Sequence, residues 1–242
     1  MTKEKYNIIF YSILIFGYVA FAILMTRAYK KVDKQVVSQI SPIFPSVILD
    51  AGHGGGDSGA VSPEGVFEKD INLSISKILK DMFLSSGFTV IMTREDDVSI
   101  HDKNLKTFRQ KKISDLNNRL KFTKINQQNS ILVSIHQNKF SQKTSNGAQI
   151  FYSNNDNRSQ DLAMCIKQTI NTMIQPNNKR NIKGDNNIFL LKNSKIPSVI
   201  VECGFLSNPE EANKLTDINY QKQIAFCIYC AFIEYSKMQL TT

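Results

Sequence analysis

Four polar side chains in this sequence are of the types that bind a metal ion and move protons. His53 lies in a glycine-rich turn with Glu68 shortly after it, and His136 and Glu202 each come directly after a short apolar run. Short runs rich in β-branched residues are typical of buried strands. Because the carboxyl ends of parallel strands meet at one edge of a sheet, we expect these side chains to converge there. Two imidazoles and two carboxylates have the composition of a catalytic zinc site with its general base.

The sequence around Glu202 favours a polar or cation-binding site, whereas the turn around His53 is also compatible with a phosphate site. Burying a carboxylate without a partner is costly, so we expect Glu202 to face a polar cleft or a cation. A glycine-rich turn after a strand is also typical of a phosphate or nucleotide site. Here the turn lacks a Gly-Lys-Ser/Thr ending, contains the bulky His53, and is followed by no helical pattern before about Ile71. Phosphate binding is therefore the minor alternative.

The apolar segments predict strands alternating with helices, which is the pattern of an α/β fold. We expect a single domain over residues 46–242 with a twisted, largely parallel sheet flanked by helices on both faces, long enough for one sizeable core. The expected strands cover residues 47–49, 88–92, 131–135, 148–152, 188–191 and 198–201. The expected helices begin after an N-cap at Asp70 and stop at Gly87, and then cover residues 103–128, 162–173 and 220–237.

Residues 103–128 combine apolar and basic side chains, which predicts a basic amphipathic helix or pair of helices. We expect six apolar side chains of this segment to face inward: Leu105, Phe108, Ile113, Leu116, Leu120 and Ile125. We expect five basic side chains to face solvent: Arg109, Lys111, Lys112, Lys121 and Lys124. A charged face of this kind is usually only solvated.

The beginning of the chain predicts attachment to a membrane. Residues Tyr6 to Thr26 carry no charge, and roughly 20 apolar residues are enough to span a bilayer. We expect residues 1–26 to be an uncleaved anchor rather than a cleaved signal segment, and residues 27–45 to be a linker. Basic residues after the span outweigh those before it, which argues against export of the remainder. We nevertheless expect export, because of the chemistry of the site.

The formal net charge of +9 and the pI near 9.3 favour anionic surroundings. No recognisable nucleic-acid-binding motif accompanies the basic residues, so we expect no nucleic acid partner. An anionic polymer, an acidic peptide or an anionic membrane surface fits this charge. The four cysteines predict buried thiols rather than disulfides or a second metal site, since Cys165, Cys227 and Cys230 lie on expected helices and Cys203 on a strand.

Four motifs in order link this chain to a known family. DAGHGG contains His53, FEKD contains Glu68, SIHQN contains His136 and VECGFLSNPEE contains Glu202. Together they resemble the zinc-dependent N-acetylmuramoyl-L-alanine amidases, which cleave peptidoglycan. The resemblance covers nearly everything from residue 47 to the end. Within the family, the segments TRED, FRQKKISDLNNRL and FLLKNSKIPSVIVECGFLSNPEE are most similar to a sporulation amidase.

The resemblance implies that His53, Glu68 and His136 are zinc ligands and that Glu202 is the catalytic carboxylate. It implies hydrolysis of the amide between the lactyl group of N-acetylmuramic acid and L-alanine of the stem peptide. A sporulation amidase would act in spore cortex maturation, through muramic δ-lactam formation, on the extracytoplasmic face of a membrane in the forespore intermembrane space. An accessory protein or lipoprotein is a further expected partner. The alternative is a non-catalytic peptidoglycan-binding module with a structural metal, in which Glu202 has no use.

Three further polar residues lie close to these motifs. Asp50 and Asp57 are near His53 in sequence, and either could accept the second ring N–H of a metal-bound imidazole. A strand-end aspartate more often caps its turn, so neither is preferred. His101 lies in no apolar run, and we expect it at the surface.

Overall fold

The computed structural model describes residues 46–125 and 129–240, together with Gly17, Val19, Phe21 and Ile23. The chain divides into two units, Met1–Pro42 and Ile43–Thr242. In the first unit the four described residues are helical, and the rest of the expected span and the linker lie outside the described residues. None of the helices that the described residues form is both long enough and apolar enough to cross a membrane.

The second unit is built on a six-stranded sheet with the order β2-β1-β3-β6-β4-β5. The strands are β1 (Ser46–Ala51), β2 (Thr89–Met92), β3 (Ser130–Asn138), β4 (Gln149–Tyr152), β5 (Lys183–Gly184) and β6 (Ser198–Phe205). β1 pairs in parallel with β2 and β3, and β3 pairs in parallel with β6. β4 runs antiparallel to β6 and parallel to β5. The prediction of a largely parallel sheet is confirmed.

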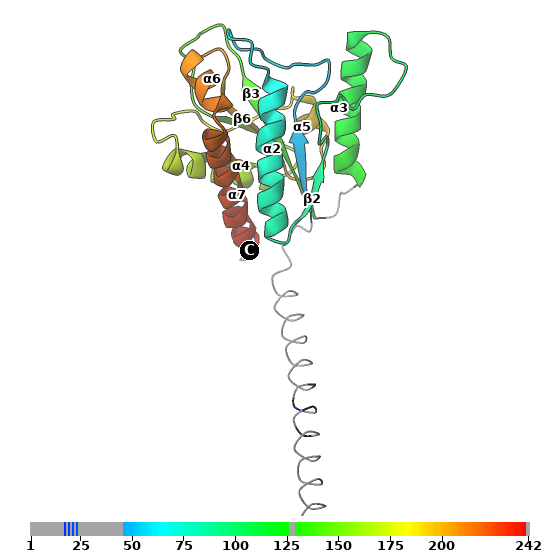
Figure 1. Cartoon of the computed structure of the whole chain (residues 1–242), viewed down its shortest axis with the longest axis vertical. Helices are drawn as coiled ribbons and strands as arrows, with labels where there is room; N and C mark the ends of the chain where they lie inside the picture. Colours follow the sequence, from blue (N-terminus) through cyan, green and yellow to red (C-terminus); the bar gives the residue numbers. More distant parts are fainter. Residues whose placement is uncertain are drawn as a thin grey trace, which may run out of the picture. The chain divides into compact units, whose positions relative to one another are not determined.

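Helices cover both faces of this sheet (Figure 1). They are α2 (Glu68–Ser85), α3 (Phe108–Ile125), α4 (Arg158–Met173), α5 (Phe189–Asn193), α6 (Pro209–Thr216) and α7 (Ile218–Leu240). Apolar side chains of α2, α4 and α7 form the larger core on one face, and those of α3 and α5 form the smaller core on the other. The predicted α/β class and the helices on both faces are confirmed.

β1 is buried along its whole length because its two faces meet the two cores. Val47 and Leu49 lie in the larger core and Ile48 lies in the smaller one, and all three are 0% exposed. Successive side chains of a strand point to opposite faces, so a strand between two helix layers is apolar at every position. The residues that follow β1 therefore start from a rigid, fully packed support.

Two predicted elements differ from the structure. α2 begins at Glu68, and its N-cap is Phe67 with no side-chain capping hydrogen bond, so Asp70 lies in the first turn instead of capping it. An acidic side chain in the first turn is favoured by the helix dipole even without a capping bond. Residues 188–191 are predicted to form a strand, but Ile188 is the N-cap of the short helix α5 and residues 189–191 belong to that helix. A run of four apolar residues does not distinguish the two states.

α3 also departs from its prediction, because its buried side is largely polar. Its buried residues are Arg119, Leu120 and Thr123, of which only Leu120 was expected to face inward. Phe108, Ile113 and Ile125, which were also expected to face inward, are 61%, 51% and 78% exposed. The prediction that these three side chains face inward is therefore wrong.

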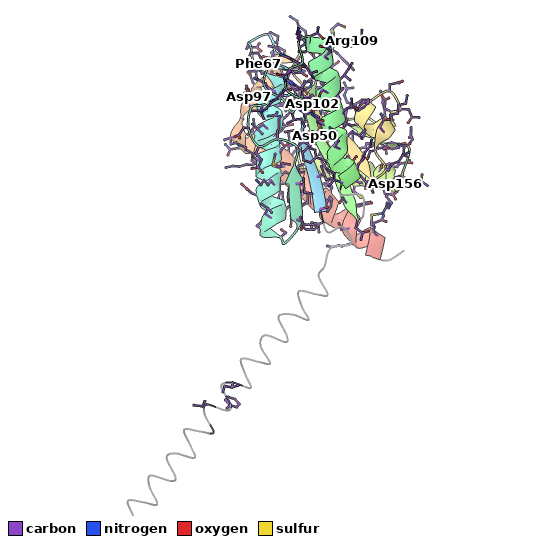
Figure 2. The ribbon with its side chains drawn as sticks, turned by 90° about the vertical axis from the view of Figure 1, so that its right-hand side faces the viewer. Asp50, Phe67, Asp97, Asp102, Arg109 and Asp156 are labelled. Atoms are coloured by element: carbon purple, nitrogen blue, oxygen red, sulfur yellow. The ribbon has the colours of Figure 1, made fainter. Side chains whose placement is uncertain are left out.

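A buried carboxylate explains the polar side of α3. Asp50, at the end of β1, is 0% exposed and accepts hydrogen bonds from Arg119 Nη1 at 2.6 Å, Thr93 Oγ1 at 2.7 Å and Ser134 Oγ at 2.6 Å. A buried charge must be paired and hydrogen-bonded, so the helix over it supplies an arginine instead of an apolar residue. Figure 2 shows Asp50 beside α3 and Arg109 near one end of that helix.

The cysteines are free thiols in the structure, as predicted. Cys165, Cys203 and Cys227 are buried and Cys230 is partly buried. Cys203 is 1% exposed and belongs to the larger core.

Candidate metal centre

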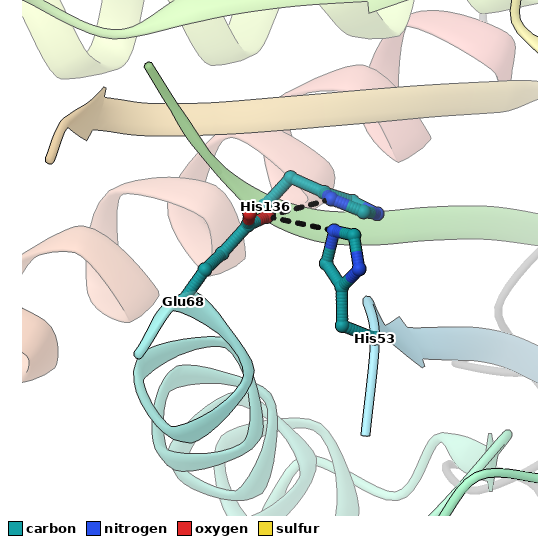
Figure 3. A group of neighbouring side chains, drawn as sticks. All are labelled: His53, Glu68 and His136. Atoms are coloured by element: carbon teal, nitrogen blue, oxygen red, sulfur yellow. Dashed lines mark hydrogen bonds and ion pairs between the residues drawn. The ribbon is translucent and has the colours of Figure 1, made fainter. Parts of the chain in front are cut away.

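His53, Glu68 and His136 come together at the carboxyl edge of the sheet (Figure 3). His53 follows β1, His136 lies near the end of β3, and Glu68 is the first residue of α2. Glu68 Oε1 lies 3.3 Å from His53 Nε2 and 2.9 Å from His136 Nδ1. One ligand atom from each residue lies within 4.8 Å of the others. These three atoms are close enough to share one metal ion.

Glu68 is held in place by three donors besides the histidines. Ala60 N donates to its Oε2 at 2.7 Å, and Gln137 N and Asn72 Nδ2 donate to its Oε1 at 3.0 and 3.2 Å. The residue is 3% exposed. A carboxylate fixed in this way is oriented before any ligand arrives, which lowers the entropic cost of binding a cation.

Two glycines allow the backbone to approach the cluster closely. A Cβ at position 52 would lie 2.3 Å from the ring of His136, and one at position 59 would lie 2.5 Å from Glu68 Oε2. Gly59 also has a φ of +66°, which disfavours residues with a side chain. Glycine is therefore required at both positions for the three side chains to meet.

His53 is oriented through its other ring nitrogen. Its Nδ1 lies 3.0 Å from Asp57 Oδ2, and Lys112 Nζ from α3 lies 3.1 Å from the same oxygen. Asp57 is therefore the aspartate that accepts the second ring N–H of His53, a choice that the sequence left open. Asp50 lies at the buried Arg119 pair instead.

The charges in this cluster favour a cation. Burial alone would lower the pKa of His53, but the hydrogen bonds and charges of Asp57 and Glu68 raise it to about 9. Burial opposes ionisation of Glu68, but hydrogen bonds to His136 and His53 hold the pKa of that carboxyl well below its usual range. The negative surroundings that favour a proton on His53 also favour a divalent ion between these side chains.

Glu202 is the fourth predicted residue, and it lies beside the cluster. Its Cα is paired with that of His136 across β3 and β6. Its Oε2 is buried, and no hydrogen bond reaches this atom from residues 46–125 and 129–240. Burial raises the pKa of the Glu202 carboxyl to about 7. An unpartnered carboxyl with a pKa near neutrality is suited to accepting and returning a proton.

The donor set fits a catalytic zinc site better than a phosphate site. Two imidazole nitrogens and one carboxylate oxygen make a recurrent set of three zinc ligands, and the buried Glu202 Oε2 adds a free acceptor beside it. Two of the N–H groups that a phosphate in the glycine turn would need are already used. Gly54 N donates to Asp57 O at 3.0 Å, and Gly55 N donates to Asp97 Oδ1 at 2.8 Å.

The structure also places the residues that the sequence did not assign to the site. His101 is partly buried and lies outside the cluster, with its Nδ1 2.8 Å from Asp102 O. Asn72, Gln137 and Lys112 contact the cluster residues or their partners and were not predicted. Asn72 had a usable signal, because a residue four positions after Glu68 lies on the same side of a helix.

Comparison with known proteins agrees with this geometry. The family Amidase_3, N-acetylmuramoyl-L-alanine amidase, matches residues 47–234. The germination-specific N-acetylmuramoyl-L-alanine amidase of Bacillus subtilis (strain 168) is 33% identical over 189 residues, which are 78% of this chain and 78% of that protein.

Two solved structures extend the comparison to the fold. The CwlD amidase from Clostridioides difficile, solved in complex with the GerS lipoprotein, is 43% identical with a TM-score of 0.77, covering 80% of this chain and 99% of that one. The N-acetylmuramoyl-L-alanine amidase from Clostridium difficile 630 is 30% identical with a TM-score of 0.68, covering 79% of this chain and 96% of that one.

An α/β sheet with a His-Glu-His cluster at its carboxyl edge defines this chain as an α/β protein with a candidate metal site. The chain belongs to the N-acetylmuramoyl-L-alanine amidase family, and it is an amidase that acts on peptidoglycan. The predicted family is confirmed.

Proposed function

We propose that this chain hydrolyses the amide between the lactyl group of N-acetylmuramic acid and L-alanine of the stem peptide, using one zinc ion. His53, Glu68 and His136 would hold the ion, and Glu202 would move the proton. The observation that supports this most strongly is the buried, unpartnered Oε2 of Glu202 beside the three converging side chains.

The residues of the cluster leave room for catalysis. Three protein ligands leave one position of a tetrahedral zinc ion for a water or a substrate oxygen. A zinc ion bound there would supply activation of water and polarisation of the scissile carbonyl. Asp57 would hold the His53 ring in the orientation that directs Nε2 at the ion, since its Oδ2 lies 3.0 Å from the opposite nitrogen.

Glu202 would perform both proton transfers. Its carboxylate accepts a proton from the attacking water, and the resulting carboxylic acid returns this proton to the alanine nitrogen as the amide bond breaks. The products are the stem peptide with a free amino terminus and a muramic acid with a free lactyl carboxylate. A pKa of about 7 lets the same group act as base and then as acid near neutral pH.

A non-catalytic wall-binding module with a structural metal is the alternative from another functional class. Structural zinc sites are closed by four protein ligands. Three converging ligands with a free carboxyl beside them favour the enzyme.

The biological setting is a separate part of the proposal. Identity of 43% to the CwlD amidase and of 33% to a germination-specific amidase supports a role in spore cortex maturation, by muramic δ-lactam formation. The enzyme would then work on the extracytoplasmic side of a membrane, anchored or secreted, in the forespore intermembrane space. The CwlD structure contains the GerS lipoprotein, so a lipoprotein partner is proposed here too.

Mass spectrometry of muropeptides tests the reaction and the metal together. The purified chain is incubated with peptidoglycan fragments after treatment with a chelator, and again after zinc is added back. We expect release of intact stem peptides with a free N-terminal alanine only when zinc is present. Cleavage at another bond, or equal cleavage with chelator, would refute the proposed reaction or its metal dependence.

A further inference from the structure

Arg180 places a guanidinium group near the end of β6. Its Cζ lies 4.3 Å from the ring centroid of Phe205, the last residue of β6, which is 0% exposed. Its Nε donates to Asn146 O at 2.7 Å. Within residues 46–125 and 129–240, its two terminal nitrogens have no hydrogen-bond partner and no carboxylate forms an ion pair with it.

The loop that contains Arg180 is fixed by side-chain amides. Asn178 Oδ1 accepts from Arg180 N at 3.0 Å, and Asn178 Nδ2 donates to Ala148 O at 2.9 Å. Gln149 Nε2 donates to Asn181 O on the other side of the arginine. Gly147 lies so close that a Cβ there would be 2.8 Å from Asn178. The guanidinium is therefore held in a set position, which reduces the entropy lost when it binds a ligand.

The charge of Arg180 acts on Glu211, but the carboxylate of Glu211 already accepts two hydrogen bonds. Arg180 lowers the pKa of Glu211 through its charge, although burial is the larger effect and raises it. Glu211 accepts from Gly147 N at 2.9 Å through Oε1 and from Phe205 N at 2.9 Å through Oε2. These bonds hold it to the backbone, and its distance from the guanidinium is too large for an ion pair.

Two connections through the sheet relate the position of Arg180 to that of Glu202. Phe205, under the guanidinium, comes three residues after Glu202 on β6, which is about 10 Å along a strand. Gln149, which holds the loop at Asn181, is the Cα partner of Glu202 across β4 and β6. Neighbouring residues on paired strands are about 5 Å apart. Arg180 therefore lies within the reach of a short peptide that starts at the reacting bond.

The surface around Arg180 is open and polar. A hollow of about 410 Å³ is lined by Asn146, Asn178, Lys179 and Arg180, among other polar residues. Its amide and cationic side chains offer many donors and no carboxylate. An anion with several acceptor oxygens suits this lining, and a carboxylate accepts two parallel bonds from an arginine.

We propose that Arg180 binds a carboxylate of the acidic stem peptide, on the side that leaves with L-alanine. This inference rests on the proposed function, because it needs the reacting bond to lie at Glu202. An extended chain covers about 10 Å in three residues, so a carboxylate on the second or third residue of the stem reaches the guanidinium. Arg180 is thus a specificity residue for the peptide and takes no part in the proton transfers.

A matched pair of substrates tests this assignment. Two synthetic muramyl tripeptides differ only in whether the carboxyl groups of the stem peptide are free or amidated. We measure kcat and KM for both with the full zinc-loaded chain, with Arg180→Gln, and with Lys183→Gln, an exposed residue outside the hollow, as the control for loss of one positive charge nearby. The melting temperature of each variant reports whether it is folded.

We expect Arg180→Gln to lower kcat/KM for the free acid about tenfold, mainly through KM, because a charge-assisted bond is lost. The amidated substrate should change less than about twofold, and Lys183→Gln should change both less than about twofold. An equal loss on both substrates would show a merely structural role, and an equal loss in Lys183→Gln would show unspecific attraction. Either result would overturn the inference.

A second measurement does not depend on the variant being folded. Released stem peptide should inhibit the wild-type chain about tenfold more strongly as the free acid than as the amide. Equal inhibition constants would overturn the assignment. Failure of the proposed function is distinguishable, because the wild-type chain would then cleave neither tripeptide.

Discussion

Glu202 differs from its three neighbours at the carboxyl edge of the sheet in having a buried oxygen to which no described residue donates a hydrogen bond. His53, Glu68 and His136 satisfy one another, whereas Oε2 of Glu202 has no hydrogen-bond partner in the part of the chain that the structure describes. An unsatisfied buried polar atom is costly, and such atoms are retained where a ligand or a reaction uses them.

The first prediction concerns Glu202 itself. Replacement by Gln keeps the shape of the side chain but removes its ability to accept and return a proton. We expect turnover of a muramyl peptide to fall by about 10²–10⁴ with an unchanged zinc content, because general acid–base catalysis contributes a factor of this size. Peptide release is followed by mass spectrometry and bound metal by elemental analysis. A variant that retains both zinc and wild-type turnover would rule out the role of Glu202.

The second prediction concerns Asp57, whose Oδ2 lies 3.0 Å from His53 Nδ1. We expect Asp57→Asn to weaken zinc binding about 10- to 100-fold, since the ring loses the acceptor that fixes its orientation. Competition with a chromogenic chelator measures the affinity. Asp161→Asn, an exposed change on α4, is the control and should leave the affinity unaltered. Equal affinities for the wild type and Asp57→Asn would contradict the orienting role.

At the scale of the element, α3 shows that contacts near the candidate site change which side chains of a helix are buried. The helix packs Arg119 against the buried Asp50 at the end of β1, and Arg119 also bonds Asp115 at 2.6 Å. Arg119 Nη2 donates to His53 O at 2.6 Å. The helix that covers the smaller core therefore also supports the backbone of a metal-ligand candidate.

The third prediction follows from the ionisation of Asp50. Burial would raise its pKa, but Arg119, His136 and two hydroxyl donors lower it to about 2, below the value of about 3.9 in an unfolded chain. The carboxylate therefore stabilises the fold above about pH 4, and this contribution is lost as the pH falls towards 2. We expect a loss of about 2 kcal/mol from this group alone.

Urea unfolding between pH 2 and pH 7 measures this effect. The free energy of unfolding of the wild type should fall more steeply below pH 4 than that of Asp50→Asn. Asp57 and Glu68 also have lowered pKa values, so both proteins should retain a common decline. Parallel curves for the two proteins would show that Asp50 is not ionised in the fold.

The short elements mark the limit of prediction from the sequence. β5 has two residues and α5 has five, so neither repeats a periodic pattern often enough to be recognised. α6 has a recognisable start in the sequence, because asparagine is a favoured N-cap and proline a favoured first helical residue. In the structure Asn208 accepts from Glu210 N and Glu211 N, and Pro209 begins the helix. The inward-facing side of α3 could not be predicted from the helix sequence. The buried Asp50 requires a cation there, and its pairing with Arg119 is a tertiary contact.

At the scale of the whole chain, part of the positive charge lies along the exposed side of α3. Arg109, Lys112, Lys121 and Lys124 are exposed along this helix, as the sequence predicted. Lys111 is partly buried. The basic face lies on the side of the sheet opposite the larger core, and it adjoins the site through the contact between Lys112 and Asp57.

The fourth prediction is that this basic face attracts the protein to the anionic cell wall. Reversing Arg109, Lys121 and Lys124 to Glu should reduce binding to isolated sacculi at low salt, and added salt should remove the difference, because exposed charges are screened. Reversing Lys77, Lys222 and Lys237 is the control, since these exposed residues lie on α2 and α7 over the other face of the sheet. An equal loss in both triple variants would indicate that only net charge matters.

The sequence predicted the architecture and the convergence of the site for the same reason. Apolar runs that end in His136 and Glu202 identify parallel strands, and parallel strands bring their ends to one edge. The partners of these residues were harder to predict. Lys112 reaches Asp57 from a helix 55 positions away, and such contacts depend on packing that no local pattern encodes.

Anomalous X-ray scattering from crystals grown with zinc, recorded on both sides of the zinc absorption edge, would locate the ion proposed at this edge of the sheet. We expect one peak about 2.0–2.2 Å from His53 Nε2, His136 Nδ1 and a carboxylate oxygen of Glu68, with Glu202 close by but not bound. A peak elsewhere, or one that Glu202 ligates while one of the three others does not, would contradict the proposed site.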